Sequence, residues 1–326
     1  MQEAKVTVVI PNYNGIKYIR NCLDALNALK DEEPFQTIIV DNGSKDGSAA
    51  LIEQDYPWVT LLALQENTGF CHAVNLGIRV SRTPYVLLLN NDTVVQSGFV
   101  KYLVEAMEES SDIFSVSSMM LTMQDPAIID DAGDLYSVLG WAVARGKGRQ
   151  ASKYEKKAEI FAACGGASLY RRSVFEEIGL FDELHFAYLE DMDIGYRARI
   201  YGYRNVYEPR AKVIHAGSGT SGSRYNAFKV SLSSTNNAYL IGKNMPLLQL
   251  LWNLPFLIVG FLVKTLFFCR KNLGMLYVSG YLKGIKRCFS EEGKPHKVSF
   301  RWKHFGNYCR IQWLLYIDTI RAFIKS

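Results

Sequence analysis

Short apolar runs alternate with longer amphipathic stretches near the start of the chain, and this order constrains the fold more than any other feature. Strands are expected over residues 5–10, 37–40, 59–64 and 85–89, and helices over 18–29, 48–54 and 69–80. The strand-like runs are apolar throughout, which is typical of parallel strands that helices cover on both faces. Strand, helix and strand in succession therefore predict right-handed parallel units of an α/β sheet.

The composition is that of a globular chain with an uneven distribution of charge. Apolar residues make up 48% of the 326 residues and charged residues 21%, which excludes disordered, collagen-like and disulfide-scaffold proteins. The six cysteines form no CxxC pair, so reduced thiols in the cytosol are expected. The net charge of +5 divides into an acidic body, residues 1–242, and a basic tail, residues 243–326, which has 14 Lys and Arg against 3 Asp and Glu. We expect the tail to contact a polyanionic surface.

The tail begins with an apolar run at residues 246–269, which Gln249, Asn253, Pro255 and Lys264 interrupt. Its longest part without a polar side chain, 254–263, is shorter than the roughly 20 residues that cross a bilayer as a helix, so a spanning helix and an interfacial helix are both possible. Basic and aromatic residues follow, and 308–324 is a further amphipathic helix candidate. This pattern is typical of an interfacial membrane anchor. Nucleic acid is not expected as a partner, because binding to nucleic acid would not explain the aliphatic residues of the run. A homodimer interface formed by these helices is a third alternative.

Polar, turn-forming residues follow three of the expected strands at their carboxyl ends. They are Pro11, Asn12, Tyr13, Asn14 and Gly15 after the first strand, Asp41, Asn42, Gly43 and Ser44 after the second, and Asn90, Asn91 and Asp92 after the fourth. In sheets of this kind ligands bind beyond the carboxyl ends of the strands. Each group alone is also explained as a turn or a helix cap, but together on one edge they predict a binding site.

The middle of the chain is less regular. Residues 126–157 are rich in Asp, Gly and basic residues, and we expect an irregular or mobile segment there, with 145–149 as a flap or a surface loop. Further on, Glu190, Asp191 and Asp193 cluster at the start of an expected helix that ends near Gly202, and residues 206–214 are expected to be extended. Because a helix dipole stabilises acids at its start, a purely structural role is one explanation of these three acids.

Six sequence blocks closely resemble, in order and spacing, family 2 glycosyltransferases of the GT-A fold. They are VVIPNYN at 8–14, IVDNGSKDGS at 39–48, ENTGF at 66–70, LNND at 89–92, GLFDE at 179–183 and LEDMD at 189–193. The resemblance implies that residues 1–242 form a Rossmann-like mixed sheet that binds a nucleotide sugar, followed by a helical membrane-associating region at 243–326. The LNND and ENTGF forms look most like bacterial rhamnosyltransferases of cell-surface polysaccharide assembly.

The resemblance also implies a divalent ion, Mg²⁺ or Mn²⁺, that neutralises the nucleotide diphosphate as it leaves. Such an ion is held by one or two carboxylates and by the substrate's phosphates, so Asp92 is the candidate ligand and Asn91 a neutral oxygen donor. By resemblance His215 is the second metal ligand; the alternative is a hydrogen-bonded histidine at a strand end. Asn90 stands where the family usually has an aspartate, which should weaken metal binding.

By the same resemblance, Asp41 is expected beside the nucleotide base or ribose, with the backbone of residues 11–14 lining that pocket. A carboxylate accepts a hydrogen bond from the imide N–H of uracil or thymine, so a UDP- or dTDP-sugar donor is expected. The alternative for Asp41 is an Asx turn. Gly69 begins a helix whose N-terminus favours anions, although it is equally explained as a cap.

For the general base, the resemblance favours Asp191, with Glu190 as the second choice. One base and no second nucleophile imply inversion at the anomeric carbon. The expected enzyme transfers a sugar, rhamnose from dTDP-rhamnose in the first instance, to a polyprenyl-diphosphate-linked glycan at the cytoplasmic face of the cell membrane. Two alternative functions are considered. An inert membrane scaffold would be consistent with Asn90 in place of the family's aspartate. A sugar nucleotidyltransferase should carry a glycine cluster after the first strand, which residues 11–15 lack.

Overall fold

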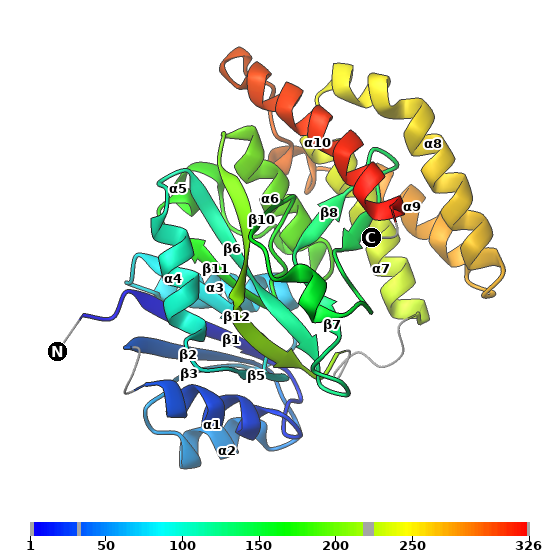
Figure 1. The fold of residues 1–326 in the computed structure, drawn as a ribbon. Helices are drawn as coiled ribbons and strands as arrows, with labels where there is room; N and C mark the ends of the chain where they lie inside the picture. Colours follow the sequence, from blue (N-terminus) through cyan, green and yellow to red (C-terminus); the bar gives the residue numbers. More distant parts are fainter. Residues whose placement is uncertain (1–2, 31–33, 218–224, 325–326) are drawn as a thin grey trace.

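A mixed β-sheet forms the centre of the computed structural model, which describes residues 3–30, 34–217 and 225–324 (Figure 1). Within these residues the sheet has ten strands; eight follow the order β10-β12-β6-β11-β4-β1-β2-β3, while β5 pairs with β12 and β7 with β6. The strands are β1 Val6–Asn12, β2 Phe35–Asn42, β3 Thr60–Leu64, β4 Tyr85–Leu89, β5 Thr93–Val95, β6 Ile113–Thr122, β7 Ile129–Asp131, β10 Ala158–Ile160, β11 Ala167–Arg171 and β12 Arg204–His215. The predicted α/β class is confirmed.

The first strands of the sheet form the parallel units that the sequence predicts. β1 pairs in parallel with β2 and with β4, and β2 pairs in parallel with β3. Further along the sheet, β11 lies antiparallel between β4 and β6, and β6 pairs in parallel with β12. Because β1, β2 and β4 run in the same direction, the polar loops that follow them meet at one edge of the sheet.

Helices cover both faces of the sheet. On one face lie α1 Ile19–Leu29, α2 Ser48–Asp55 and α4 Phe99–Glu108, and on the other lie α3 Phe70–Val80, α5 Val174–Ile178 and α6 Glu190–Ile200. The alternation of side chains along β1 explains the two cores, since Val8 and Ile10 pack with the first group while Val9 packs with the second. Val8, Val9 and Ile10 are all fully buried, so helices must cover both faces of the sheet.

The segment 126–157 is folded, so the expectation of an irregular or mobile segment is wrong. It contains β7, a two-stranded sheet of β8 Asp134–Tyr136 and β9 Ala142–Ala144, and the 3₁₀ turn η1 Ala151–Tyr154. The 145–149 run is tied to it, because Arg145 N–H donates to the Gly133 carbonyl (2.9 Å) and Gly148 N–H to the Ile129 carbonyl (2.8 Å). Strands of three residues are too short to give a recognisable alternation in the sequence.

Four helices form a layer beside the sheet at the end of the chain (Figure 1). They are α7 Ala227–Asn244, α8 Leu247–Cys269, α9 Gly274–Cys288 and α10 Phe305–Phe323, with the 3₁₀ turns η3 Lys294–His296 and η4 Trp302–His304 before α10. Leu240, Leu257 and Leu315 of this layer pack in one core with Tyr136 of β8 and Tyr196 of α6. The layer therefore shares a core with elements that pack beside the sheet.

Helix α7 is fastened to the body by buried charges. The Lys243 ammonium lies 2.7 Å from Asp182 and 2.9 Å from Asp193, and Arg197 lies 2.9 Å from Asp193. Burial opposes ionisation of Asp193, but Lys243 and Arg197 hold its pKa well below its usual range. The division of the chain at 242/243 stays a prediction, and its boundary falls inside α7.

Helix α8 is long and apolar enough to cross a membrane by length and composition. One stripe of the helix nevertheless packs on the protein: Gln249, Asn253, Leu257 and Gly260. Asn253 exchanges two amide hydrogen bonds with Gln312 of α10, at 2.8 and 2.7 Å, and Tyr196 O–H donates to Gln249 (2.9 Å). Two of the polar residues that interrupt the apolar run, Gln249 and Asn253, therefore attach the first part of α8 to the rest of the molecule, and Gly260 lies against Leu139 further along.

Candidate active site

The loops after β1, β2 and β4 are joined by the side chain of Asn12. Its amide nitrogen donates to Asp41 Oδ1 (2.7 Å) and to Ser48 Oγ (2.9 Å), and its oxygen accepts a hydrogen bond from the Asn91 amide (2.7 Å). A Cβ on Gly15 would lie 2.2 Å from both the Asn12 and Asn91 amides, so a side chain there would displace the hydrogen bond between them. Three residues predicted to line the nucleotide or donor site are thus brought together.

The remaining candidates for nucleotide binding lie on the same edge. Asp41 Oδ2 also accepts the N–H of Ser44, three residues on (3.0 Å), whereas the Asx turn given as the alternative would take the N–H of Gly43. Tyr13 is 37% exposed and Pro11 is half-buried. Asn14 has φ 48°, and its Oδ1 accepts the Lys45 N–H (2.9 Å), which ties the first loop to the second.

Gly69 stands at the start of α3 against the loop that leads to the candidate base. Its φ is +92°, and a Cβ there would lie 2.6 Å from the Phe186 ring. Asn42 holds this region, since its amide donates to the Gly69 carbonyl (3.0 Å) and its oxygen accepts the Thr68 N–H (2.9 Å). The role of Asn42 in positioning Gly69 was not identified from the sequence, although it directly follows Asp41.

Asp92 and His215 face each other, with His215 Nε2 3.2 Å from Asp92 Oδ1. The register of the sheet causes this, because His215, the last residue of β12, pairs with Thr93 of β5. His215 Nδ1 lies 2.7 Å from Asp130 Oδ2, and Lys147 Nζ lies 2.6 Å from Asp130 Oδ1. Asp130 and Lys147 belong to the segment expected to be irregular, and no motif singles them out.

The charged side chains around His215, namely Asp92, Asp130 and Lys147, stabilise one another's ionised forms. Burial alone would lower the pKa of His215, but hydrogen bonds to Asp130 and Asp92 raise it to about 9. Burial alone would raise the pKa of Asp130, but hydrogen bonds from His215 and Lys147 lower it to about 2. Without a metal ion, a protonated imidazole therefore compensates the two carboxylates.

The donor set fits a hard divalent ion. Asp92 and His215 offer one carboxylate and one imidazole close enough to share an ion, and substrate phosphates would complete the coordination. A metal-binding histidine usually donates its other ring N–H to a carboxylate, and Asp130 is placed to accept it. The hydrogen bond to Asn12 is made by the amide nitrogen of Asn91, so it leaves the amide oxygen, through which Asn91 would bind an ion, unoccupied by this contact.

Asp191 and Glu190, at the start of α6, have different surroundings. Asp191 is half-exposed; burial raises its pKa, which hydrogen bonds from the backbone N–H groups of Met192 and Gly165 partly offset. Glu190 is buried, its Oε2 has no hydrogen-bond partner among the described residues, and burial together with Asp191 raises its pKa to about 8. Asp193, expected to cluster with them, instead points toward Lys243.

The loop before α6 is strained and is held from the helical layer. Phe186, Tyr188 and Leu189 have φ values of 59°, 70° and 66°, a region that costs a non-glycine residue about 1–3 kcal/mol. The Asn236 amide of α7 donates to the carbonyl oxygens of His185 (2.8 Å), Ala187 (2.8 Å) and Tyr188 (2.9 Å). The 3₁₀ turn η2 Glu183–His185 precedes this loop. Asn236 is a second positioning residue that was not identified from the sequence.

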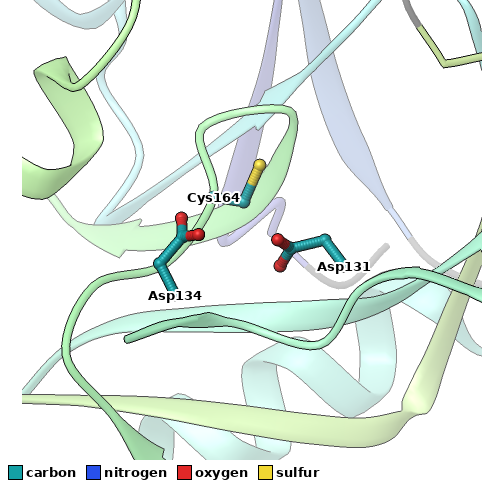
Figure 2. Close-up of side chains that lie close together, drawn as sticks. All are labelled: Asp131, Asp134 and Cys164. Carbon is teal, nitrogen blue, oxygen red and sulfur yellow. The ribbon is translucent and has the colours of Figure 1, made fainter. Parts of the chain in front are cut away.

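A further acidic cluster lies beside Asp191. Figure 2 shows the carboxylates of Asp131 and Asp134 directed toward each other beside Cys164, and ligand atoms of the three lie within 4.8 Å of one another. Burial is the main cause that raises the pKa of Asp131 to about 7 and that of Asp134 well above its usual range, and Asp191 adds to both. A thiol suits softer metals than Mg²⁺, so Asp92 and His215 fit the expected ion better.

The turn at 165–166 connects the two sides of the site. The Asn90 N–H donates to the Gly166 carbonyl (2.8 Å), and the neighbouring Gly165 N–H contacts the Asp191 carboxylate. Asp41, Asp92 and Asp191 therefore lie around one edge of the sheet, and not on separate faces of the molecule. The arrangement can bind a nucleotide diphosphate on the β1, β2 and β4 side and offer a carboxylate base on the α6 side.

Comparison with known proteins finds glycosyltransferases among the relatives of this chain. The L-rhamnosyltransferase of Mycobacterium tuberculosis that is named for N-acetylglucosaminyl-diphospho-decaprenol is 28% identical over 242 residues, 66% of this chain and 77% of that protein. The poly-β-1,6-N-acetyl-D-glucosamine synthase of Staphylococcus aureus is 26% identical over 212 residues, 63% of this chain but 48% of the synthase.

Solved structures agree on the fold. The crystal structure of GalNAc-T7 with UDP, GalNAc and Mn²⁺ superposes with a TM-score of 0.59 at 15% identity, over 74% of this chain and 48% of that chain. The mannosyltransferase PcManGT of Pyrobaculum calidifontis, with GDP-Man and Mn²⁺, superposes with a TM-score of 0.54 at 14% identity, over 100% of this chain and 89% of that chain. The family model of glycosyl transferase family 2 matches residues 7–179, more than half of the sequence. The chain belongs to glycosyl transferase family 2.

Proposed function

We propose that this glycosyltransferase transfers rhamnose from dTDP-rhamnose to a polyprenyl-diphosphate-linked glycan, with inversion at the anomeric carbon and with Mg²⁺ or Mn²⁺ as cofactor. The observation that carries the proposal is that Asp41, Asp92 and Asp191 lie around one sheet edge, joined through Asn12 and the 165–166 turn. The mycobacterial relative, named for L-rhamnosyl transfer to a decaprenol-linked N-acetylglucosamine, supports the choice of sugar and acceptor.

On the donor side, Asp92 and His215 would hold the divalent ion, which supplies positive charge to the leaving diphosphate. The chain's own contribution is to fix these two ligands. Asp130 accepts the Nδ1 hydrogen of His215, which leaves Nε2 turned toward Asp92. Asp41 and residues 11–14 bind the nucleoside, and the positive end of the α3 dipole at Gly69 faces the pyrophosphate, although the N–H groups of Gly69 and Cys71 already donate to Asn67 and to the Phe186 carbonyl.

On the acceptor side, Asp191 accepts the proton of the attacking hydroxyl. The oxygen–carbon bond to the sugar forms as the bond between the anomeric carbon and the diphosphate oxygen breaks. Burial raises the pKa of Asp191, which makes it a stronger base than an exposed carboxylate. Glu190 serves less well, because its pKa of about 8 keeps it protonated at neutral pH.

The helical layer associates with the cytoplasmic face of the membrane in this proposal. Leu248, Trp252 and Leu266 of α8 are more than 60% exposed, whereas its Gln249, Asn253 stripe is attached to the body. A helix fixed along one side to a polar domain does not cross the bilayer alone, so we propose that α8 lies in the interface. The basic residues of the tail add attraction to anionic lipids.

A transfer assay tests the proposal. The purified chain is incubated with N-acetylglucosaminyl-diphospho-polyprenol and dTDP-rhamnose, UDP-N-acetylglucosamine or GDP-mannose, with Mn²⁺, with Mg²⁺ or with EDTA. We expect a rhamnosylated lipid whose anomeric configuration is opposite to that of the donor, and no product in EDTA, by mass spectrometry and NMR. Transfer from UDP-N-acetylglucosamine alone would contradict the rhamnosyl assignment. If no nucleotide sugar reacts and none raises the melting temperature, the scaffold alternative is preferred.

A further inference from the structure

A cavity of about 710 Å³ lies apart from the candidate active site. Its walls are the second half of α3, residues 178–184, the end of α6 and residues 295–304, a segment that we call the strap. Gly69 begins α3 at the active site, whereas Arg79, which lines the cavity, lies ten residues further on, about 15 Å along the helix axis. The cavity is therefore separate from the donor site.

The strap is fixed over the cavity from both ends. The Val298 N–H donates to the carbonyl oxygen of Lys243 at the end of α7 (3.0 Å). Just beyond the strap, the Asn307 amide donates to the carbonyl oxygen of Ile200 at the end of α6 (2.9 Å). The cavity is thus built by the body and the helical layer together.

The two carboxylates that line the cavity are already occupied. Asp182 is 2.7 Å from Lys243 and 3.1 Å from His296, and it accepts two further hydrogen bonds. Glu183 accepts a hydrogen bond from Asn75 (2.9 Å) and lies 2.9 Å from His72. Neither carboxylate is left to neutralise the remaining cations of the wall.

Lys297 and Arg301 of the strap line the cavity and have no carboxylate within ion-pair distance in the described part of the chain. His304, which also lines it, is only 8% exposed, and its Nε2 has no hydrogen-bond partner among those residues. Two unpaired cations and an unpartnered buried imidazole nitrogen suit an anion with several acceptor oxygens, such as a phosphate.

The same strap exposes aromatic side chains. Trp302 is 79% exposed, and Phe300 and Phe305 on either side of it are also exposed. Helix α10 continues from the strap with a further exposed tryptophan, Trp313. Aromatic residues next to Lys and Arg are typical of the membrane–water interface, where lipid phosphates lie at the same depth. A soluble phosphate compound would give no reason for this apolar rim.

We propose that the cavity binds the phosphate headgroup of an anionic membrane lipid. Lys297 and Arg301 contact the phosphate, and the aromatic side chains of the strap enter the interface beside it. The site orients the enzyme on the membrane and adds a specific contact to the general attraction of the basic tail. It does not depend on the identity of the donor or of the glycan acceptor.

The test compares two double variants with the same change of charge. Lys297→Gln with Arg301→Gln removes the cavity cations, and Lys283→Gln with Lys286→Gln removes two exposed cations of α9, outside both the cavity and the strap. Binding to vesicles of phosphatidylcholine, with and without phosphatidylglycerol, is measured by flotation without donor or acceptor. We expect the cavity variant to lose roughly tenfold or more in affinity for the anionic vesicles, and the control variant no more than about threefold. Unchanged melting temperatures show that both variants are folded.

Equal losses in the two variants would overturn the proposal, because the tail would then act only through its total charge. The source of the phosphate is tested with inorganic phosphate at constant ionic strength. If phosphate raises the melting temperature of the wild type but the cavity variant floats like the control, the site serves a soluble anion and the lipid proposal is wrong. This test measures no sugar transfer, so a failed transfer assay would not change its result. A failed vesicle test would likewise not contradict the proposed function.

Discussion

Each half of the candidate active site is held by the amide of one asparagine, but the two asparagines come from different parts of the chain. Asn12 joins Asp41 to Asn91 on the donor side, so this half is held by residues that lie within its own loops. Asn236 of α7 holds the strained loop before Asp191 on the acceptor side. The donor half is therefore preorganised locally, whereas the position of the base depends on the helical layer.

The two halves also differ in how their carboxylates are compensated. On the donor side, Asp92 and Asp130 face His215 and Lys147. On the acceptor side, the pKa of Asp131 is raised to about 7 and that of Glu190 to about 8, mainly by burial, and no cation pairs with either carboxylate in the described part of the chain. A metal ion can replace the cation of the donor half, whereas the acceptor half retains protons. Variants should therefore separate donor binding from turnover.

The largest effect is expected from Asp92→Ala. Without this carboxylate His215 is the only remaining candidate protein ligand of the pair, so the stabilisation that a dTDP-sugar and Mn²⁺ give together should disappear, and transfer with it. The measurement is the melting temperature with nucleotide sugar, with and without Mn²⁺. Asp125→Ala, which removes an exposed carboxylate, is the control. Full metal-dependent stabilisation of the Asp92 variant would mean that the ion is bound elsewhere, with the Asp131 cluster next to be tested.

Asp191→Asn should leave the donor half intact and remove the base. We expect kcat to fall about 10²- to 10⁴-fold, with the donor-dependent rise of the melting temperature unchanged. Glu190→Gln is the matched control, and it should retain most activity because Glu190 already carries a proton at neutral pH. If the Asp191 variant turns over at a near-normal rate while the Glu190 variant is inactive, the two assignments must be exchanged.

The donor half is the part that the sequence predicts well. Parallel strands end at one edge, so polar residues directly after β1, β2 and β4 had to meet, and Asp41 and Asp92 lie where that argument puts them. The position of His215 beside Asp92 agrees with the resemblance, and the β5–β12 register explains it.

The arrangement of the acceptor half could not be predicted from the sequence in this way. Asp131 and Asp134 lie on strands of three residues, which leave no alternation to recognise. Asn236 acts on carbonyl groups about 50 residues earlier in the chain, and nothing in its own helix distinguishes it from the neighbouring Asn237. The stripe that attaches α8 likewise depends on Gln312 of α10. Contacts of this kind are set by tertiary packing, which a local pattern does not encode.

A pair of alanine variants tests the difference between the two asparagines directly. Asn236→Ala releases three carbonyl groups of the strained loop, and we expect kcat to fall roughly 10- to 100-fold with little change in the KM for the donor. Asn12→Ala should mainly raise the donor KM, by about tenfold. Asn237→Ala, next to Asn236 but with its side chain hydrogen-bonded to Tyr136, is the control for stability. If both asparagine variants change kcat and KM alike, the two halves are not independent.

The smallest effect concerns the uncompensated acids of the acceptor half, through the pH dependence of stability. The pKa of Asp131 is about 7 in the folded chain against 3.8 in the unfolded chain, so the folded state binds the proton more tightly and loses stability as the pH rises from about 4 to about 7. Asp131→Asn cannot ionise, and its Oδ1 can still accept the Gly133 N–H. We expect the variant and the wild type to have the same free energy of unfolding below pH 4, and the variant to be more stable by about 1 kcal/mol at pH 8. The difference stays this small because half-buried Asp134 can hold the shared proton when Asp131 ionises. Urea unfolding in EDTA at a series of pH values measures the difference. A variant that is less stable than the wild type at pH 8 would show that a cation compensates this cluster after all.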